Sequence, residues 1–362
     1  MSEDWILSVQ DLKTHFFTRE GVVRAVDGVG FDLAPGQVLG IVGESGCGKS
    51  VTALSILGIV DHPGRIVEGR ILLRPAQGGP PADLARLHPK GRRIRSIRGG
   101  EIALIFQEPM TSLSPVHTIG QQISETIRLH HRVDRRRSRE QAVEVLRSVG
   151  MPDPEEGAKL YPFQLSGGLR QRALIAQALA GEPRVLIADE PTTALDVTTQ
   201  AQILDLLRDL QKRRGMAIVL ITHDLGVIAE MADEVLVMYL GKGVERAPVD
   251  RIFHSPGHPY TRALLNSMPG LGTAAKQALP SISGTVPPAF RRPAGCPFHP
   301  RCVEFLDGTC NRREPQPVMV RPDQEVLCLR REPGEPSQMQ GNRPKTDNVY
   351  QNRTLRPDGK RE

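Results

Sequence analysis

The fold of this chain is decided by one short stretch, Gly43-Glu44-Ser45-Gly46-Cys47-Gly48-Lys49-Ser50. An apolar run precedes it at Val38 to Val42, and a helix is predicted after it, from Lys49 to Leu57. The spacing G-x-x-x-x-G-K-S between a strand and a helix is typical of a loop whose backbone N–H groups surround phosphate oxygens. We therefore expect Lys49 to bridge the β- and γ-phosphates of a nucleotide and the Ser50 hydroxyl to ligate Mg²⁺.

Two other interpretations of this loop bear on its chemistry. A chance glycine-rich turn would not need a strand before it and a helix after it, so the phosphate-binding interpretation is preferred. Cys47 is interpreted as a passive member of the loop, and a redox role is the alternative, because a helix N-terminus can lower a thiol pKa. The whole loop and the next residue, Val51, form the predicted nucleotide-binding set.

Further apolar runs along the chain indicate the fold class. Their length suits strands that are buried on both faces of a parallel sheet, and they are Ile102 to Phe106, Val185 to Ala188 and Ala217 to Ile221. Between the last two, residues 203 to 210 carry apolar side chains at helical spacing, with Gly215 as a stop signal. This alternation of strands and helices predicts an α/β fold.

Length and composition restrict the class of protein. The 362 residues, 39% of them apolar, suffice for one sizeable core and a second, smaller unit. The net charge of +6 suits an anionic partner such as a nucleotide or a lipid surface, and we expect no nucleic acid as a partner. No apolar run approaches the roughly 20 residues of a membrane-crossing helix. The start MSEDWILSVQ lacks the pattern of a secretory leader, so we expect a cytoplasmic protein that meets a membrane through partners.

The chain divides by composition into three parts. Residues 1–250 carry the α/β pattern, with a strongly charged helical part at about 108–180, residues 251–332 are rich in proline, and residues 333–362 are polar and expected to be disordered. Two basic stretches, Arg86 to Arg98 and Arg135 to Arg139, are interpreted as solvated faces. Contact with lipid headgroups is the alternative for the first.

A second group of site residues is predicted where another apolar run ends. The run at Val185 to Ala188 leads directly to Asp189 and Glu190. Adjacent side chains on a strand point to different sides, so two neighbouring acids can take two roles. Phosphoryl transfer to water needs a metal ligand and a base, and we assign Asp189 to the Mg²⁺ shell and Glu190 to the base. The alternative, a solvated strand end, is disfavoured by the phosphate loop upstream.

Several further motifs resemble those of the ABC family of ATPases. Residues 165–172, LSGGLRQR, look like its signature motif, commonly LSGGQ followed by a basic helix. Residues 189–196 resemble its extended Walker B and D-loop, residues 221–224 its switch histidine, and residues 106–108 its Q-loop. The motifs occur in the family's order. The resemblance implies an ABC-type P-loop ATPase domain with a RecA-like core, an antiparallel β part and a helical subdomain, followed by a small loop-rich C-terminal domain.

The resemblance also implies roles for particular residues. Two such domains meet head to tail, so that each ATP lies between one chain's phosphate loop and the other chain's signature. The implied contacts with the partner are Ser166, Gly167, Gly168 and Gln171, with Asp196 in the D-loop. Within one chain, Gln107 would touch Mg²⁺ or the attacking water and report to the membrane subunits, and His223 would hold the γ-phosphate. An N-terminal aromatic residue would stack on adenine, and Phe16 is the candidate, with Phe17 next.

The segment after residue 250 resembles the C-terminal extension of oligopeptide- and dipeptide-type importer ATPases. Residues 258–265, HPYTRALL, carry this resemblance, as do GESG at 43–46 and QEPMTSLSP at 107–115. It implies a subunit that hydrolyses ATP to power peptide import from the cytoplasmic face of the inner membrane. Its implied partners are two membrane permeases, a second and related ABC ATPase, and an extracytoplasmic peptide-binding protein.

Four of the five cysteines gather near the C-terminus, at Cys296, Cys302, Cys310 and Cys328. Disulfides are not expected in a reducing compartment, and four thiolates suit zinc or an iron–sulfur cluster. The spacing C-x5-C-x7-C-x17-C lacks the C-x2-C pair common in zinc fingers. Some peptide-importer ATPases carry a [4Fe–4S] cluster on a similar set, so the resemblance favours that cluster. Zinc, unliganded thiols and a disulfide are the alternatives.

Two other functions are weighed against peptide import. One is import of another solute, such as nickel or a glycoside, because substrate contacts lie in other subunits. The other is a soluble ABC ATPase that acts on ribosomes or DNA. Translation-type proteins usually carry two ATPase units in one chain, and the DNA-repair type separates its motifs by a long coiled coil. This sequence has one phosphate loop and no such coiled coil.

Overall fold

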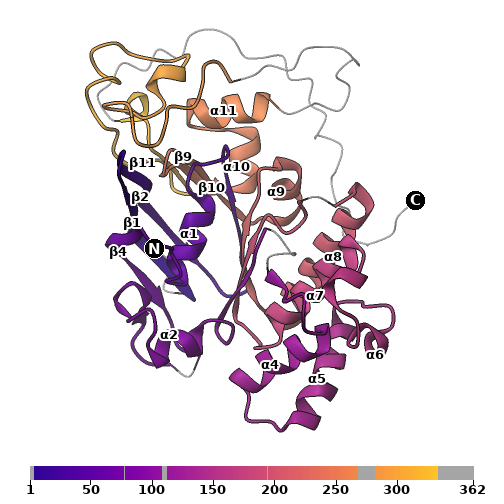
Figure 1. Ribbon diagram of the computed structural model, residues 1–362. Coiled ribbons are helices and arrows are strands. Elements are labelled where there is room, and N and C mark those ends of the chain that lie inside the picture. The colour runs from indigo at the N-terminus through magenta and orange to yellow at the C-terminus, as the bar shows by residue number, and fades with distance from the viewer. Residues whose placement is uncertain (1–3, 77, 108–111, 194, 268–281, 333–362) are drawn as a thin grey trace.

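Two sheets and the helices around them make up the described part of the chain (Figure 1). The computed structural model describes residues 4–76, 78–107, 112–193, 195–267 and 282–332. Within these ranges, one sheet has eight strands and the other has four. The predicted α/β class is confirmed, with an antiparallel part beside a mainly parallel one.

The larger sheet carries the strands that were expected from the apolar runs. In sheet order its strands are β11 (Val318–Arg321), β12 (Gln324–Val326), β10 (Lys242–Pro248), β9 (Glu234–Tyr239), β3 (Val38–Val42), β8 (Ala217–Ile221), β7 (Val185–Asp189) and β6 (Ile102–Ile105). The strands from β9 to β6 run parallel, whereas β10, β12 and β11 pair antiparallel. Because parallel strands share one carboxyl edge, the loops after β3, β7 and β8 meet there.

The smaller sheet is antiparallel and lies beside the first helix. Its strands, in sheet order, are β2 (Gly21–Leu33), β1 (Leu7–Thr18), β4 (Gly64–Leu73) and β5 (Ala82–Asp83). The helix α1 (Lys49–Ile56) contacts it through the Oγ atoms of Thr14 and Ser55, which are 2.8 Å apart. The short η1 (Leu84–Arg86) and α2 (Arg92–Ile97) follow this sheet along the chain.

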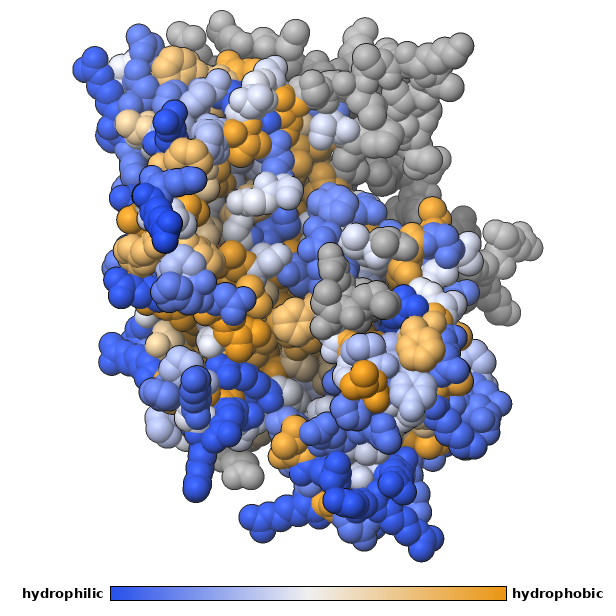
Figure 2. All heavy atoms as spheres, viewed as in Figure 1, coloured by the Kyte–Doolittle hydropathy of each residue, from blue (hydrophilic) through white to orange (hydrophobic). Residues whose placement is uncertain are grey.

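A helical subdomain fills the range in which charged helices were predicted. It contains α4 (Ile119–His130), α5 (Arg135–Ser148), α6 (Pro154–Gly157), η2 (Pro162–Gln164) and α7 (Gly167–Leu179). Side-chain caps begin the first two helices, since Thr118 accepts from the N–H of Gln121 and Asp134 from that of Arg137. The arginines at the start of α5 are exposed, and Figure 2 shows hydrophilic side chains gathered at this lower end of the molecule.

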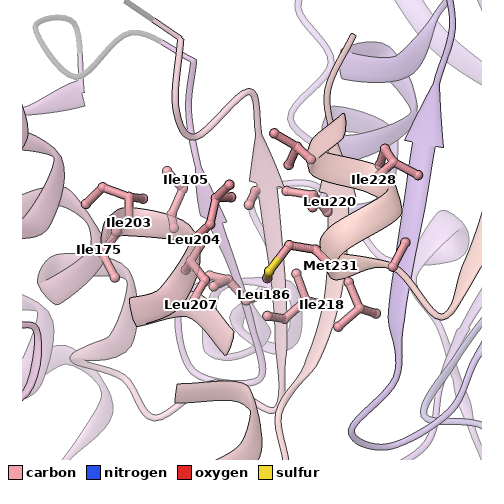
Figure 3. Close-up of a cluster of buried hydrophobic side chains, with 14 of the residues drawn as sticks. Ile105, Ile175, Leu186, Ile203, Leu204, Leu207, Ile218, Leu220, Ile228 and Met231 are labelled. Carbon is pink, nitrogen blue, oxygen red and sulfur yellow. The ribbon is translucent and has the colours of Figure 1, made fainter. Parts of the chain in front are cut away.

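Both faces of the parallel strands are buried. On one face, Leu186, Ile218 and Leu220 pack against α8 (Val197–Arg214) and α9 (Leu225–Met231) (Figure 3). On the other face, alternate side chains such as Ile187 and Val219 pack with α1 and the smaller sheet. Gly215, in the left-handed conformation with φ 61°, ends α8 as predicted. A sheet covered on both sides holds its carboxyl edge rigid.

The C-terminal segment adds to the main sheet. It contains α10 (Val249–His254), α11 (Pro259–Asn266), η3 (His299–Arg301) and η4 (Leu329–Arg331), besides β11 and β12. The predicted boundary near residue 250 follows the end of β10, yet β12 pairs with β10 and Phe298 belongs to the main core cluster. The predicted disordered tail, residues 333–362, lies outside the described residues. Within the described ranges, no helix has both the length and the apolar character needed to span a bilayer.

Candidate active site

The phosphate loop connects β3 to α1 at the carboxyl edge of the parallel strands. Its backbone needs glycine at two positions, because Gly43 and Gly48 have φ angles of 152° and 104°. A Cβ atom on Gly43 would collide with the carbonyl oxygen of Met238, and one on Gly48 with that of Ala25. The loop therefore passes close to neighbouring backbone and presents the N–H groups at the start of α1 to an anion.

The side chains of Lys49 and Cys47, both members of this loop, are buried. The Nζ atom of Lys49 donates to the carbonyl oxygens of Gly43 at 2.7 Å and Glu44 at 3.2 Å, which holds the ammonium group against the loop. Burial raises the pKa of the Cys47 thiol, and the nearby charge of Lys49 only partly offsets this. The redox interpretation of Cys47 rested on a lowered pKa, so a raised pKa favours the passive interpretation.

Asp189 and Ser50 face each other beside the loop, and they fit the predicted Mg²⁺ site. Asp189 ends β7 and is 8% exposed, and burial raises its pKa against the hydrogen bond from the Ser50 side chain. Its Oδ1 atom is buried without a hydrogen-bond partner among the described residues. A hydroxyl and an unpartnered buried carboxylate oxygen are the hard oxygen ligands that Mg²⁺ prefers.

Glu190 directly follows the end of β7. Its φ of 48° lies in the left-handed region, which residues other than glycine rarely adopt and which is often found at functional sites. Its carboxylate accepts from Gln107 Nε2 at 2.9 Å and from Thr193 Oγ1 at 2.9 Å, and it lies 3.1 Å from His223 Nδ1. The structure therefore brings together three predicted residues that follow three different strands, and it adds Thr193.

The surroundings of Glu190 keep its carboxylate charged. Burial favours the neutral form, but hydrogen bonds from His223 and Thr193 outweigh it and lower the pKa below its ordinary value. Asp189, one residue earlier, has its pKa shifted upward. The two neighbouring acids thus differ in environment, as expected of a metal ligand and a proton acceptor.

The signature residues form a separate, exposed surface. Ser166 begins α7, where its Oγ accepts from the N–H of Leu169 at 3.4 Å, and both Ser166 and Gly167 are exposed. In Figure 1, α7 lies with the helical subdomain, whereas α1 lies beside the smaller sheet. Gly168 packs against the side chain of Thr199, because a Cβ atom there would lie 2.7 Å from Thr199 Cγ2.

Asp196 and Gln171 differ in exposure: the first is on the surface and the second is buried. Asp196 begins α8 and is exposed, with its carboxylate accepting from the N–H of Thr199 at 3.0 Å and from its Oγ1 at 2.7 Å. These hydrogen bonds lower the pKa of Asp196. Gln171 is only 3% exposed, whereas Ser166 and Gly167 are exposed, and its predicted contact with a partner's nucleotide stays a prediction.

Phe16 lies on the face of β1 that meets α1. Thr14, two residues earlier on the same strand, contacts Ser55 of α1, and alternation therefore points Phe16 to that side. Its ring packs over Gly64, where a Cβ atom would lie 2.6 Å from the ring. Phe17 is 40% exposed and lies beneath the guanidinium of Arg65, so Phe16 is the more enclosed of the two rings, and its contact with adenine stays a prediction.

Two contacts of the phosphate loop were missed in the sequence. The backbone N–H of Glu44 donates to the hydroxyl of Tyr260 at 2.9 Å, and Arg301 donates to both carboxylate oxygens of Glu44, at 2.6 Å and 3.0 Å. Arg301 directly precedes Cys302 of the cysteine set. A separation of 257 positions leaves no periodic or local signal that could have linked these residues.

The four C-terminal cysteines lie together in one part of the fold. Cys296, Cys310 and Cys328 are buried, Cys302 is half-buried, and none forms a disulfide. Burial raises the pKa of Cys296 to about 11 and that of Cys302 to about 12, and neighbouring cysteines contribute to both shifts. Within the described residues, no three potential ligands are arranged as a ready-made metal site.

Comparison with known proteins was made on both the sequence and the fold. A family model described as ABC transporter matches residues 26–193, and one described as oligopeptide/dipeptide transporter, C-terminal region, matches residues 244–310. The chain is 50% identical over 329 residues to a probable peptide ABC transporter ATP-binding protein of Sinorhizobium fredii, covering 90% of this chain and 95% of that one. It is 45% identical over 323 residues to the dipeptide transport ATP-binding protein DppD of Escherichia coli, covering 89% and 96%.

Solved structures agree with this comparison. The ATP-binding cassette MJ0796, in a dimeric post-hydrolysis state bound to ADP and phosphate, matches with a TM-score of 0.58 and 27% identity, covering 67% of this chain and 98% of that one. The fold and the site thus define the class, an ATP-hydrolysing subunit of the ABC type. Within that class, the chain belongs to the ABC transporter ATP-binding proteins that carry the oligopeptide/dipeptide transporter C-terminal region. The resemblance stated from the motifs is confirmed.

Proposed function

We propose that this chain powers the import of di- and oligopeptides as one of two ATPase subunits of an ABC importer. The observation that carries the proposal is the extent of the similarity. Identity of 45–50% with peptide-transport subunits covers about nine-tenths of the chain, including the C-terminal segment. That segment matches a region described for oligopeptide and dipeptide transporters.

ATP would bind first to the chain's own phosphate loop. The N–H groups of residues 45–50 would receive the β- and γ-phosphates, and Lys49 would exchange its carbonyl contacts for phosphate oxygens. Ser50 and Asp189 would hold Mg²⁺, with Gln107 near it, and this ion would neutralise phosphate charge during the reaction. Phe16 would provide a face for the adenine.

Hydrolysis would take place beside Glu190. A water oxygen forms a bond to the γ-phosphorus, the bond from that phosphorus to the β–γ bridging oxygen breaks, and ADP leaves with that electron pair. Glu190 takes the proton from the water, which its charged carboxylate can do, while Gln107 orients the water. His223 would hold the γ-phosphate with the nitrogen that does not contact Glu190.

The second half of each ATP site would come from another subunit. Ser166, Gly167 and Gly168 are exposed or half-exposed at a helix start, as a surface that meets a partner's phosphates requires. The proposed assembly has two membrane permeases, this chain and a related second ATPase at the cytoplasmic face, and an extracytoplasmic peptide-binding protein.

A [4Fe–4S] cluster held by Cys296, Cys302, Cys310 and Cys328 is a further part of the proposal. Its support is the shared location of the four cysteines, three of them buried and Cys302 half-buried. Iron would have to displace thiol protons whose pKa values are raised by burial, which opposes binding. Once bound, the cluster would stabilise the segment by linking four positions that are far apart along the chain.

Reconstitution tests the transport function. The chain would be purified with its two permeases and second ATPase, placed in vesicles, and assayed for ATP hydrolysis with its binding protein loaded with a dipeptide, a glycoside or nickel. Stimulation by the peptide-loaded protein alone is expected. Stimulation only by another solute would contradict the peptide assignment, and association with ribosomes or DNA without permeases would contradict transport.

Elemental analysis after anaerobic purification tests the cluster. About four iron and four sulfide per chain are expected, with iron lost in C302S and retained in C47S, whose sulfur lies in the phosphate loop. A colourless wild-type protein without iron would exclude the cluster.

A further inference from the structure

Glu44 occupies an unfavourable position for a carboxylate. It is the second residue of the loop that surrounds the phosphates of ATP, where negative charge from the ligand gathers. Its side chain is 25% exposed, so solvent screens it only in part. A carboxylate at this point would repel the phosphates, and it could also pair with Lys49, whose Nζ is already 3.2 Å from the Glu44 carbonyl oxygen.

The C-terminal segment holds this residue from two directions. Arg301 donates to Oε2 of Glu44 at 2.6 Å and to Oε1 at 3.0 Å, which is the two-pronged geometry that arginine forms best with a carboxylate. Tyr260 accepts from the Glu44 N–H at 2.9 Å. The carboxylate and the N–H of Glu44 are therefore both directed toward the C-terminal segment.

The two side chains that hold Glu44 are themselves fixed by packing. Arg301 is 4% exposed, and it also donates to the carbonyl oxygen of Ser283 at 3.1 Å and to the Tyr239 hydroxyl at 3.4 Å. Tyr260 is fully buried, with ring centroids 4.8 Å from Tyr239 and 5.3 Å from Phe298. A side chain that is fixed in this way can set the position of the loop.

We propose that Arg301 and Tyr260 are positioning residues of the ATP site, which act through Glu44. Arg301 neutralises the Glu44 carboxylate and holds it away from the phosphates and from Lys49, and Tyr260 sets the direction of the loop backbone at its entry. The C-terminal segment is thereby part of the machinery that binds ATP, although it supplies no group that touches the nucleotide. The inference rests on ATP binding by the phosphate loop.

A charge-compensation experiment on the isolated full-length chain tests this role. The dissociation constant of ATP with Mg²⁺ would be measured by titration calorimetry for the wild type, R301Q, E44Q, and the double variant E44Q/R301Q. R301Q should bind ATP about tenfold more weakly, because it leaves an unpaired carboxylate beside the phosphates. The double variant should recover to within about threefold of the wild type, because its two amides carry no charge. Y260F should weaken binding by about threefold, because the Glu44 N–H loses its acceptor.

Several outcomes separate this role from a general effect on folding. Arg251 forms an exposed ion pair with Asp323 at 3.3 Å in the same segment, and R251Q should bind ATP like the wild type. Wild-type affinity in R301Q would overturn the proposal. So would a double variant no better than R301Q, because lost packing is not repaired by removing the charge of Glu44. If the wild type and R251Q both failed to bind ATP, the ATPase assignment would be at fault instead.

In the assembled transporter, the same variants should change kinetic constants unequally. R301Q should raise KM for ATP while leaving kcat within about twofold of the wild type, because Glu190, Gln107 and His223 are untouched. R301K should rescue part of the KM, because lysine restores charge without the two-pronged contact. An equal fall of kcat in R301Q and R301K with unchanged KM would contradict a role in ATP positioning.

Discussion

The two halves of this chain are held in place by different interactions. Up to Pro248, aliphatic side chains fill both faces of a parallel sheet, as Leu186 and Ile187 do on its opposite sides. After Pro248, the segment has short strands and turns, and much of its interior is polar or aromatic. Buried or nearly buried groups there include His258, Thr261, Arg301 and Gln324.

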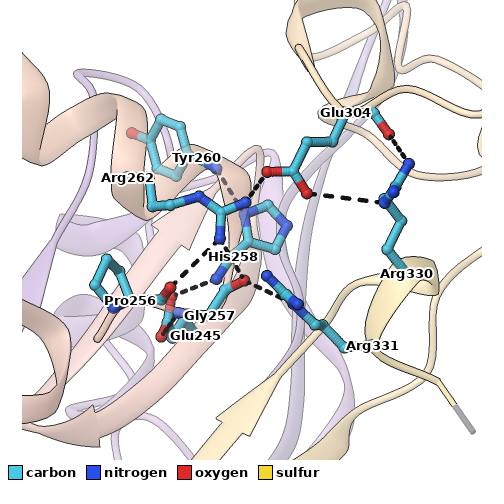
Figure 4. Close-up of polar contacts among 9 residues, drawn as sticks. All are labelled: Glu245, Pro256, Gly257, His258, Tyr260, Arg262, Glu304, Arg330 and Arg331. Atoms are coloured by element: carbon cyan, nitrogen blue, oxygen red, sulfur yellow. Dashed lines mark hydrogen bonds and ion pairs between the residues drawn. The ribbon is translucent and has the colours of Figure 1, made fainter. Parts of the chain in front are cut away.

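The polar contacts of the second half converge on a few atoms, among them the carboxylate of Glu245 on the adjoining strand β10 (Figure 4). The buried carboxylate of Glu245 accepts from the N–H groups of Gly257 and His258, at 2.6 Å and 2.8 Å, and from Gln324 Nε2 at 2.7 Å. Arg331 donates to the carbonyl oxygen of Gly257 at 3.1 Å. Hydrogen bonds of this kind are directional and costly to leave unmade, so they allow one arrangement of the segment.

This difference matches what each half has to do. An aliphatic sheet provides a rigid edge on which loops of different composition can meet, as the loops of Lys49, Glu190 and His223 do. The C-terminal segment must place two side chains, Tyr260 and Arg301, against one residue of the phosphate loop. A network of specific polar contacts achieves that placement where an apolar surface would permit sliding.

The largest expected effect tests whether the chemistry belongs to the first half alone. E190Q should bind ATP but hydrolyse it about 100-fold or more slowly in the assembled transporter, because the amide cannot take the proton of the attacking water. Phosphate release measures the rate, and thermal unfolding should show an unchanged C-terminal segment.

A matched control exists for this variant. Glu182 also has a left-handed backbone, with φ 55°, and it is exposed away from the site. E182Q should therefore hydrolyse ATP at the wild-type rate. Near-normal hydrolysis by E190Q would refute the assignment of Glu190 as the base.

The first half could largely be predicted from the sequence, because local patterns determine it. Apolar runs located β3, β7 and β8, and the glycine spacing located the phosphate loop. The end of one apolar run located Asp189 and Glu190, and the resemblance to the family located His223. The apolar runs did not show the left-handed backbone at Glu190 or the hydrogen bond from Thr193, three residues later, because both belong to the loop after the strand.

For the second half, the sequence predicted the general character of the segment but not its contacts. Proline density and four cysteines indicated a loop-rich unit, but not that β12 would pair with β10. Nor did any pattern indicate that Arg301 would pair with Glu44, since contacts between distant loops have no period. Burial also has no sequence signal of its own here, since Gln171 is buried in α7 only five residues after the exposed Ser166.

The C-terminal segment should make the stability of the folded chain sensitive to acid, through the buried His258. Burial, and then the charges of Arg262 and Arg331, lower the pKa of His258 to about 3, while Glu245 accepts from its backbone N–H. The ordinary value is 6.5, so below that pH the unfolded chain binds a proton that the folded chain does not. Stability should therefore fall as the pH drops from 6.5 toward 3, by about 2 kcal/mol between about pH 7 and 5. Denaturant unfolding at each pH measures this.

Two variants make this prediction specific. H258N keeps an acceptor for the Tyr260 N–H, which His258 Nδ1 provides at 3.0 Å, and should reduce the pH dependence by about the stated amount. H88N removes an exposed histidine from the first half and should keep the wild-type dependence. An unchanged slope in H258N would show that other groups cause the acid sensitivity.

A substitution on the signature surface should have a smaller effect on ATP hydrolysis, and only when two ATPase subunits are assembled. S166R places a bulky cation on an exposed helix start that is proposed to meet the partner's ATP, and it should lower hydrolysis by the assembled pair about tenfold. S96R, at an exposed serine on α2, is the matched control and should have no such effect. Equal activities of S166R and S96R would place the shared site elsewhere.

The smallest expected effect concerns Phe16, where the sequence argument was weakest. Stacking on a base is worth about 1–3 kcal/mol when it is complete, and a half-buried ring beside Gly64 offers only part of its face. F16A should therefore weaken ATP binding about threefold to tenfold, while F17A should not, because Phe17 lies on the opposite side beneath Arg65. Tripolyphosphate, which has no base, should bind F16A and the wild type equally. An equal loss for both ligands would mean that Phe16 supports the loop through Gly64 and does not contact adenine.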